Sequence, residues 1–126
     1  MNVALAVAAV MAIVGGLAHS YMGERMILMP LFRSDGIPES PFGGVQFTRV
    51  MIRFAWHFFA VVVWSTAVLF LLLSVSAVGG GDWTAVRVIA AYWAVFAVVV
   101  LVMSRGRHFA WIGGTIVAVA AWWGTV

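Results

Sequence analysis

The chain has 126 residues, of which 65% are apolar and 9% charged, with a mean hydropathy of +1.12 and a formal net charge of +3. A soluble domain has about 45–50% apolar and about 25% charged residues, so this composition predicts a small integral membrane protein with a single domain. The charge is too sparse for nucleic-acid binding, and the absence of cysteine excludes disulfides, iron–sulfur clusters and thiol catalysis.

The first apolar run extends from Val3 to about Met22 and has no charged residue. About 20 apolar residues are enough for a helix to cross the hydrocarbon core of a bilayer, which is about 30 Å thick. A cleaved signal peptide would need a basic segment before the run, and only Asn2 follows Met1 there. We therefore expect residues of about 3–22 to form a membrane-spanning helix.

The next stretch, residues of about 24–44, contains three prolines and the Gly43-Gly44 pair, which interrupt regular structure. Apolar residues surround Pro30, so we expect an interfacial segment in one of two forms. Either the first helix continues to Met29 and projects beyond the membrane, or the stretch lies flat on the membrane surface.

Three further apolar runs predict helices over about 46–78, 83–103 and 107–125. Within lipid the backbone must satisfy its own hydrogen bonds, which favours helices over irregular chain. The links at 79–82 (Gly-Gly-Gly-Asp) and 104–107 (Ser-Arg-Gly-Arg) are short, so the helices that they join should be antiparallel neighbours. The expected fold is an all-α, antiparallel bundle of four transmembrane helices.

In this topology one side of the membrane carries six of the seven arginines, and only Arg87 lies near the other side. Cytoplasmic loops are enriched in Lys and Arg, so the arginine-rich side should be cytoplasmic and both termini should lie on the other side. The arginines on the predicted cytoplasmic side are Arg25, Arg33, Arg49, Arg53, Arg105 and Arg107.

Small residues recur every four positions on the first and last helices. Such stripes let helix backbones approach closely inside a membrane, so we expect both faces to be buried. The alternative is that alanine and glycine are simply frequent in this chain. The stripes consist of Ala4, Ala8, Ala12 and Gly16 on the first helix and Ala110, Gly114 and Ala118 on the last.

The three histidines fall at a similar depth near the predicted cytoplasmic boundary, and a glutamate follows the first of them by five residues. Three imidazoles and a carboxylate form an ordinary ligand set for zinc, copper or iron, and two facing histidines could hold a haem iron. The alternative is that each histidine only directs its polar edge toward water. The residues predicted for the metal or haem site are His19, His57, His108 and Glu24.

A second group of polar residues follows a spacing of four, which places Arg49, Arg53 and His57 on one face of the second helix. Arg53 is the expected partner of Glu24, since an arginine near the hydrocarbon favours a carboxylate or a phosphate. This face could clamp an anion or the carboxylate of a cofactor, or it could anchor the chain to anionic lipid headgroups. The residues predicted for the anion or lipid site are Arg49, Arg53, Arg105 and Arg107.

The chain shows no phosphate-binding glycine loop and no Ser-His-Asp set, so a stand-alone enzyme is not expected. Its pattern, including segments 19–25 (HSYMGER) and 53–57 (RFAWH), is similar in general to small four-helix bacterial inner-membrane proteins, which implies the same location. One hypothesis is an accessory subunit of a redox or metal-handling system that binds a metal ion or haem near its cytoplasmic face. The other is a non-catalytic module that binds anionic lipid and packs with itself or with a larger membrane complex.

Overall fold

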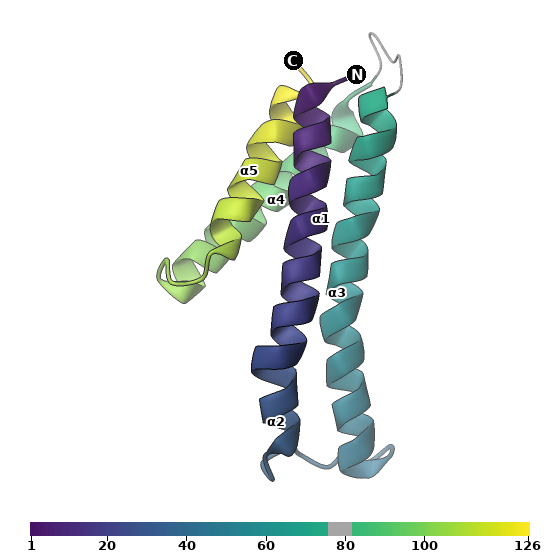
Figure 1. The fold of residues 1–126 in the computed structure, drawn as a ribbon, viewed down its shortest axis with the longest axis vertical. Coiled ribbons are helices and arrows are strands. Elements are labelled where there is room, and N and C mark those ends of the chain that lie inside the picture. Colours follow the sequence, from purple (N-terminus) through teal and green to yellow (C-terminus); the bar gives the residue numbers. More distant parts are fainter. Residues whose placement is uncertain (76–81) are drawn as a thin grey trace. The chain divides into compact units, whose positions relative to one another are not determined.

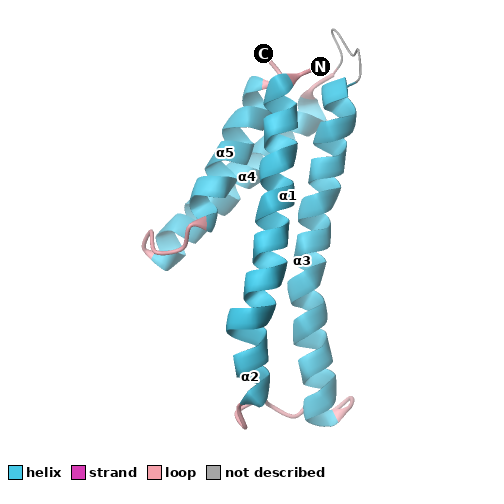
Figure 2. Cartoon of the chain, in the orientation of Figure 1, coloured by secondary structure: helices cyan, strands magenta, loops and turns pink. Residues whose placement is uncertain are grey.

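The computed structural model describes residues 1–75 and 82–126, and this part of the chain is helical with no β-strand, as predicted (Figure 2). The predicted link at Gly79–Gly81 and the predicted end of the second helix at Val78 lie outside the described residues. The α-helices labelled in Figure 1 are α1 (Val3–Gly23), α2 (Met29–Arg33), α3 (Gly44–Val75), α4 (Thr84–Ser104) and α5 (Ala110–Trp123), and the π-helix η1 (Glu24–Leu28) joins α1 to α2.

The first helix continues without a break through η1 and α2, so that 31 residues from Val3 to Arg33 are helical. Of the two forms expected for residues 24–44, the continuing helix is therefore confirmed as far as Arg33. Pro30 has no N–H to donate, and its ring crowds the carbonyl four residues earlier. The wide turn of η1, in which the N–H of Met29 donates to the carbonyl of Glu24, comes directly before this proline and carries the helix through it.

α3 begins at Gly44, two residues before the predicted start, and runs for 32 residues. Gly44 has a φ of 64°, a left-handed conformation that glycine adopts without steric cost. Its N–H donates to the carbonyl of Ser40 over 2.8 Å, which closes the turn before the helix. The two glycines at 43 and 44 thus mark the start of a helix and end the irregular segment that follows Arg33.

Three helical segments are long and apolar enough to cross a membrane: Val3–Arg33, Gly44–Val75 and Thr84–Ser104. α5 has only 14 residues, which at 1.5 Å per residue extend about 21 Å, less than the hydrocarbon thickness of about 30 Å. The fourth helix, predicted over 107–125, is shorter than expected; the chain turns at Arg105 and Gly106, which have φ of 52° and 77°, and Nδ1 of His108 then accepts the N–H of Ala110. α5 begins only at Ala110.

The chain divides into two compact units: unit 1 consists of residues 1–15 and 63–126, and unit 2 of residues 16–62. Within unit 1, α4 and α5 pack closely at Gly114, where a Cβ would lie 3.0 Å from the ring of Phe96 and 3.2 Å from Cβ of Ala97. The buried apolar residues of unit 1 are Leu5, Ala8, Ala9, Ala12, Val63, Ala67, Phe70, Val86, Ala90, Trp93, Ala97, Val117, Ala118 and Ala121.

Most of the predicted small-residue faces are buried. Ala4 and Ala110 are half-buried at the ends of their stripes, and the fully buried members are Ala8, Ala12, Gly16, Gly114 and Ala118. These positions confirm that the two stripes face protein and are not merely a consequence of composition.

The two ends of the chain meet in unit 1. Nδ2 of Asn2 donates to the carbonyl of Gly124 over 2.7 Å, and the backbone N–H of Asn2 donates to the carbonyl of Ser74 over 2.7 Å. Arg87 donates from Nε to Oγ1 of Thr125 over 3.1 Å. These bonds fix the N-terminal end of α1 beside the C-terminal end of α5.

Candidate functional site

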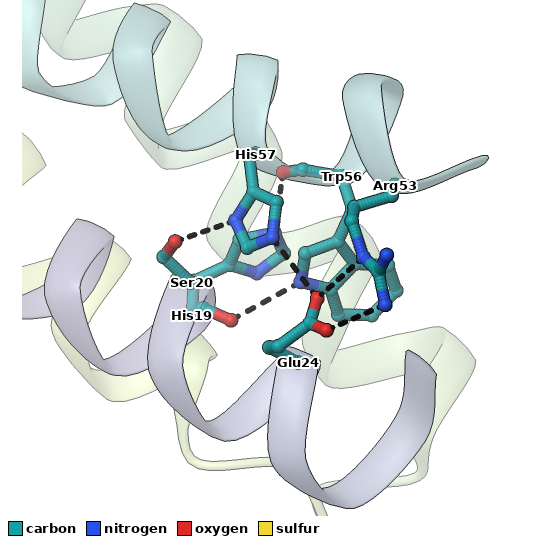
Figure 3. A network of polar contacts seen from close by, with 6 residues as sticks. All are labelled: His19, Ser20, Glu24, Arg53, Trp56 and His57. Carbon is teal, nitrogen blue, oxygen red and sulfur yellow. Dashed lines mark hydrogen bonds and ion pairs between the residues drawn. The ribbon is translucent and has the colours of Figure 1, made fainter. Parts of the chain in front are cut away.

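A group of polar side chains of unit 2 gathers where the end of α1 and the start of η1 lie against α3 (Figure 3). α1 and η1 supply a serine and two residues predicted for the metal site. α3 supplies three side chains from positions 53 to 57, which span about one helical turn. We call this group the polar cluster, and it consists of His19, Ser20, Glu24, Arg53, Trp56 and His57.

The ion pair of the polar cluster joins Arg53 to Glu24, as the sequence predicted. Nη2 of Arg53 donates to Oε1 over 2.8 Å, and Nε donates to Oε2 over 3.2 Å. This two-bond geometry matches the planar guanidinium to the planar carboxylate. The guanidinium also lies 4.9 Å from the centre of the Phe32 ring, so that α2 contributes an aromatic face to the same arginine.

His57 lies between Ser20 and Glu24, and each of its ring nitrogens has a partner. Nε2 is 3.1 Å from Oε2 of Glu24, and Nδ1 is 2.6 Å from Oγ of Ser20. An ionised carboxylate only accepts hydrogen bonds, so in the neutral imidazole Nε2 carries the proton. Nδ1 is then the acceptor for the serine hydroxyl. In both hydrogen bonds the donor therefore lies on the Ser20 side: Ser20 donates to His57, and His57 donates to Glu24.

Beside these hydrogen bonds, the side chains of His19 and Trp56 each contact the backbone carbonyl of the other residue. Nε1 of Trp56 donates to the carbonyl of His19 over 3.1 Å, and Nε2 of His19 lies 3.3 Å from the carbonyl of Trp56. Their rings stack with centroids 4.7 Å apart and an interplanar angle of 7°. Gly23 makes room for this contact, because a Cβ there would lie 2.0 Å from Nε1 of Trp56.

A shallow, open hollow of about 380 Å³ lies on one face of α3 beside the polar cluster, lined by residues of this helix alone, and we call it the α3 groove. Phe54 and Phe58 stack within it at a centroid distance of 5.5 Å and are 59% and 52% exposed. The groove is therefore apolar along most of its length, with two polar side chains from the cluster on its wall. Its lining consists of Val50, Arg53, Phe54, His57, Phe58 and Val61.

The four residues predicted to bind a metal are brought together only in part. Glu24 and His57 are in direct contact, and His19 lies in the same cluster. His108 belongs to unit 1, where it is exposed and its Nδ1 accepts the N–H of Ala110 at the start of α5. Within residues 1–75 and 82–126 no group of three or more His, Cys, Asp or Glu is arranged to hold a metal ion. The metal or haem site stays a prediction.

The four arginines predicted for an anion site are divided between the two units. Arg105 and Arg107 are exposed in the turn before α5, in unit 1. Arg49 and Arg53 lie on α3 in unit 2. The Nε of Arg49 is buried without a hydrogen-bond partner among the described residues, and no carboxylate in this part of the chain pairs with it. Among the described residues Arg49 thus has no counter-ion, and it lies on the same helix face as Arg53.

Sequence reasoning did not identify Ser20 and Trp56 as members of the cluster. The sequence does carry one signal for the serine, because Ser20 and Glu24 are four residues apart and so lie on one helix face. That spacing matches the two nitrogens of a single imidazole ring, which both residues contact. The sequence carries no comparable signal for Trp56, since tryptophan is common near membrane boundaries, where its amphipathic ring favours the level of the headgroups.

Comparisons of the chain with protein-family models, with curated proteins and with solved structures found no match.

Proposed function

We propose that the chain is a bacterial inner-membrane protein, an antiparallel helical bundle that holds an anionic phospholipid on the cytoplasmic side of α3. The observation that carries the proposal is the cation of Arg49, for which the described residues supply no counter-ion, together with the apolar α3 groove, whose lining begins at the next residue, Val50. Both termini then lie on the non-cytoplasmic side, in agreement with the arginine distribution.

The length of α3 supports this depth for its arginines. Its 32 residues extend about 48 Å, about 18 Å more than the hydrocarbon core of a bilayer. Residues 58–75 contain no charged side chain and extend about 27 Å, so they fill the hydrocarbon core. Arg49 and Arg53 then lie at the level of the lipid headgroups, where a phosphate is the most abundant anion.

The two parts of a phospholipid match the two parts of this surface. A headgroup phosphate supplies the counter-ion that Arg49 lacks, since each basic residue near an anionic membrane surface contributes about 1 kcal/mol. The stacked rings of Phe54 and Phe58 offer an exposed apolar face for the acyl chain. Arg53 is already paired with Glu24 and contributes mainly to the wall of the groove.

The test is binding of phosphatidylglycerol to the purified chain in mild detergent, measured by native mass spectrometry and by the shift in melting temperature. Phosphatidylcholine should bind more weakly, because its headgroup has no net charge. Arg49→Gln should weaken phosphatidylglycerol binding about fivefold, which corresponds to about 1 kcal/mol. Arg33→Gln is the control, since Arg33 is an exposed arginine of unit 2 that lies on α2 and not on α3.

Phe58→Ala separates the acyl-chain contact from the headgroup contact and should weaken both lipids equally. Equal binding of the two lipids by the unmodified chain would contradict the proposal. An equal loss for Arg49→Gln and Arg33→Gln would show that the arginines act only through net charge, and the proposed site on α3 would be wrong.

A further inference from the structure

A serine, an imidazole and a carboxylate lie in one line of hydrogen bonds in unit 2 (Figure 3). Oγ of Ser20 is 2.6 Å from Nδ1 of His57, and Nε2 of His57 is 3.1 Å from Oε2 of Glu24. A weak nucleophile becomes reactive when a base lies within hydrogen-bond distance and a third group orients that base. Both conditions are met by the two distances in this line.

The direction of the hydrogen bonds also fits this chemistry. Arg53 donates two hydrogen bonds to Glu24, which favours the ionised carboxylate. The carboxylate then requires a proton on Nε2 of His57, and the lone pair of Nδ1 is left facing the hydroxyl of Ser20. The imidazole is therefore held in the tautomer that a general base needs, with its basic nitrogen on the serine.

We propose that Ser20 is an activated nucleophile that accepts an acyl group from an ester, with His57 as general base and Glu24 as a positioning residue. Oγ of Ser20 bonds to the ester carbonyl carbon while its proton passes to Nδ1 of His57. The carbon–oxygen bond to the leaving alcohol breaks, and that alcohol takes the proton from Nδ1. Water then attacks the acyl carbon of the Ser20 ester while its proton passes to Nδ1 of His57. The bond between Oγ of Ser20 and the acyl carbon breaks, Oγ takes the proton from Nδ1, and a carboxylic acid is released.

The α3 groove indicates the class of ester. His57 lines the groove between Phe54 and Phe58 and also bonds to Ser20, so an acyl chain lying along the two rings would pass beside the imidazole. The substrate class is therefore an acyl ester of an amphiphile. This choice of substrate rests on the proposed lipid groove, whereas the reactivity of Ser20 rests only on the hydrogen bonds of the polar cluster.

The first experiment treats the full chain in detergent with a tagged fluorophosphonate, which phosphonylates activated serines. We expect labelling at a single site, identified as Ser20 by peptide mass spectrometry and lost in Ser20→Ala. Labelling should fall at least tenfold in His57→Gln. Ser34→Ala is the matched control and should label normally, because Ser34 is exposed and its hydroxyl donates only to the carbonyl of Leu31.

The second experiment uses the fact that the chain has no cysteine. Ser20→Cys and Ser34→Cys each introduce a single thiol, and alkylation by iodoacetamide is measured at pH 6 and at pH 9. The ratio of the two rates cancels the difference in accessibility between the sites. An ordinary thiol with a pKa of about 8.5 is almost fully protonated at pH 6, so Ser34→Cys should react far more slowly there than at pH 9.

For Ser20→Cys the ratio of the rate at pH 6 to the rate at pH 9 should be at least tenfold higher than for Ser34→Cys. Adding His57→Gln to Ser20→Cys should return the ratio to the control value. The proposal requires both the labelling and the raised ratio, and the failure of either overturns it. Neither readout depends on bound phosphatidylglycerol, so a failure of the lipid site is distinguishable from a failure of the nucleophile.

Discussion

Gly23 allows the closest packing in unit 2, and its replacement by alanine gives the sharpest test of the structure. An added Cβ would lie 2.0, 2.3 and 2.5 Å from three atoms of the Trp56 indole, so the ring must move. The movement breaks the hydrogen bond from Nε1 to the carbonyl of His19 and the stacking of the two rings.

The expected cost follows from these contacts. The hydrogen bond contributes about 1 kcal/mol, the ring pair about 1 kcal/mol, and overpacking strain costs at least about 1 kcal/mol. Alanine has a better helix propensity than glycine by about 1 kcal/mol. Gly23→Ala should therefore lower the free energy of unfolding by about 2 kcal/mol.

Gly15 provides a control on the same helix, eight residues away, because a Cβ there meets nothing within 4 Å. Gly15→Ala should raise the free energy of unfolding by about 0.5–1 kcal/mol through helix propensity alone. The assay is unfolding of the purified chain by sodium dodecyl sulfate titrated into mild detergent, followed by far-ultraviolet circular dichroism. In a Trp56→Leu background the penalty of Gly23→Ala should disappear. If the two glycine variants were equally stable in the unmodified background, the reasoning about Trp56 would be refuted.

Four further predictions concern the ion pair, pH, topology and metal content. A double-mutant cycle of Arg53→Ala and Glu24→Ala should give a coupling of about 1 kcal/mol, since the pair is bidentate but its side chains are 49% and 27% exposed; additive losses would contradict the pairing. Hydrogen bonds from the hydroxyl and then the backbone N–H of Thr84 hold the pKa of Asp82 below its usual value, so its contribution to stability should be present above the usual carboxyl pKa and be lost as the pH falls through the lowered one. Melting curves from pH 2 to 6 should show this loss only below the usual carboxyl pKa, and Asp82→Ala should abolish it. A reporter fused after Val126 should read outside the cytoplasm, and one fused before the first residue should agree with it because the two ends are hydrogen-bonded; opposite readings would contradict the prediction of four membrane crossings. Elemental analysis and a visible spectrum test the predicted metal or haem, and a preparation without stoichiometric metal or a Soret band would refute that prediction.

The sequence was sufficient for predictions that depend only on how deep a residue lies along its own helix. Glu24 and Arg53 are opposite charges that each follow or precede a long uncharged run, so their depth and therefore their pairing could be inferred. The contact between Ser20 and His57 could not, because it depends on how far each helix is rotated about its axis. A rotation of one residue, about 100°, would have moved the hydroxyl to another face.

The start of the last helix shows a different reason for a wrong prediction. Hydropathy predicts that the helix starts at about 107, but α5 begins at Ala110. Nδ1 of His108 accepts the N–H of Ala110, and a side-chain acceptor of this kind competes with the backbone hydrogen bonds of a helix. The wide turn that begins at Glu24 was also not predicted, because it depends on Pro30, six residues later, and not on the local apolar pattern. Backbone hydrogen bonds of this kind leave little trace in hydropathy.

The pairing of the chain's two ends has a consequence for the order in which the protein assembles. Asn2 and Gly124 are 122 positions apart, whereas unit 2 consists of consecutive residues from 16 to 62. Contacts between nearby residues form early and quickly, while those between distant residues wait for loop closure. During synthesis the polar cluster can therefore form once residue 62 has left the ribosome. The hydrogen bond from Asn2 to Gly124 can form only after residue 124 has been made.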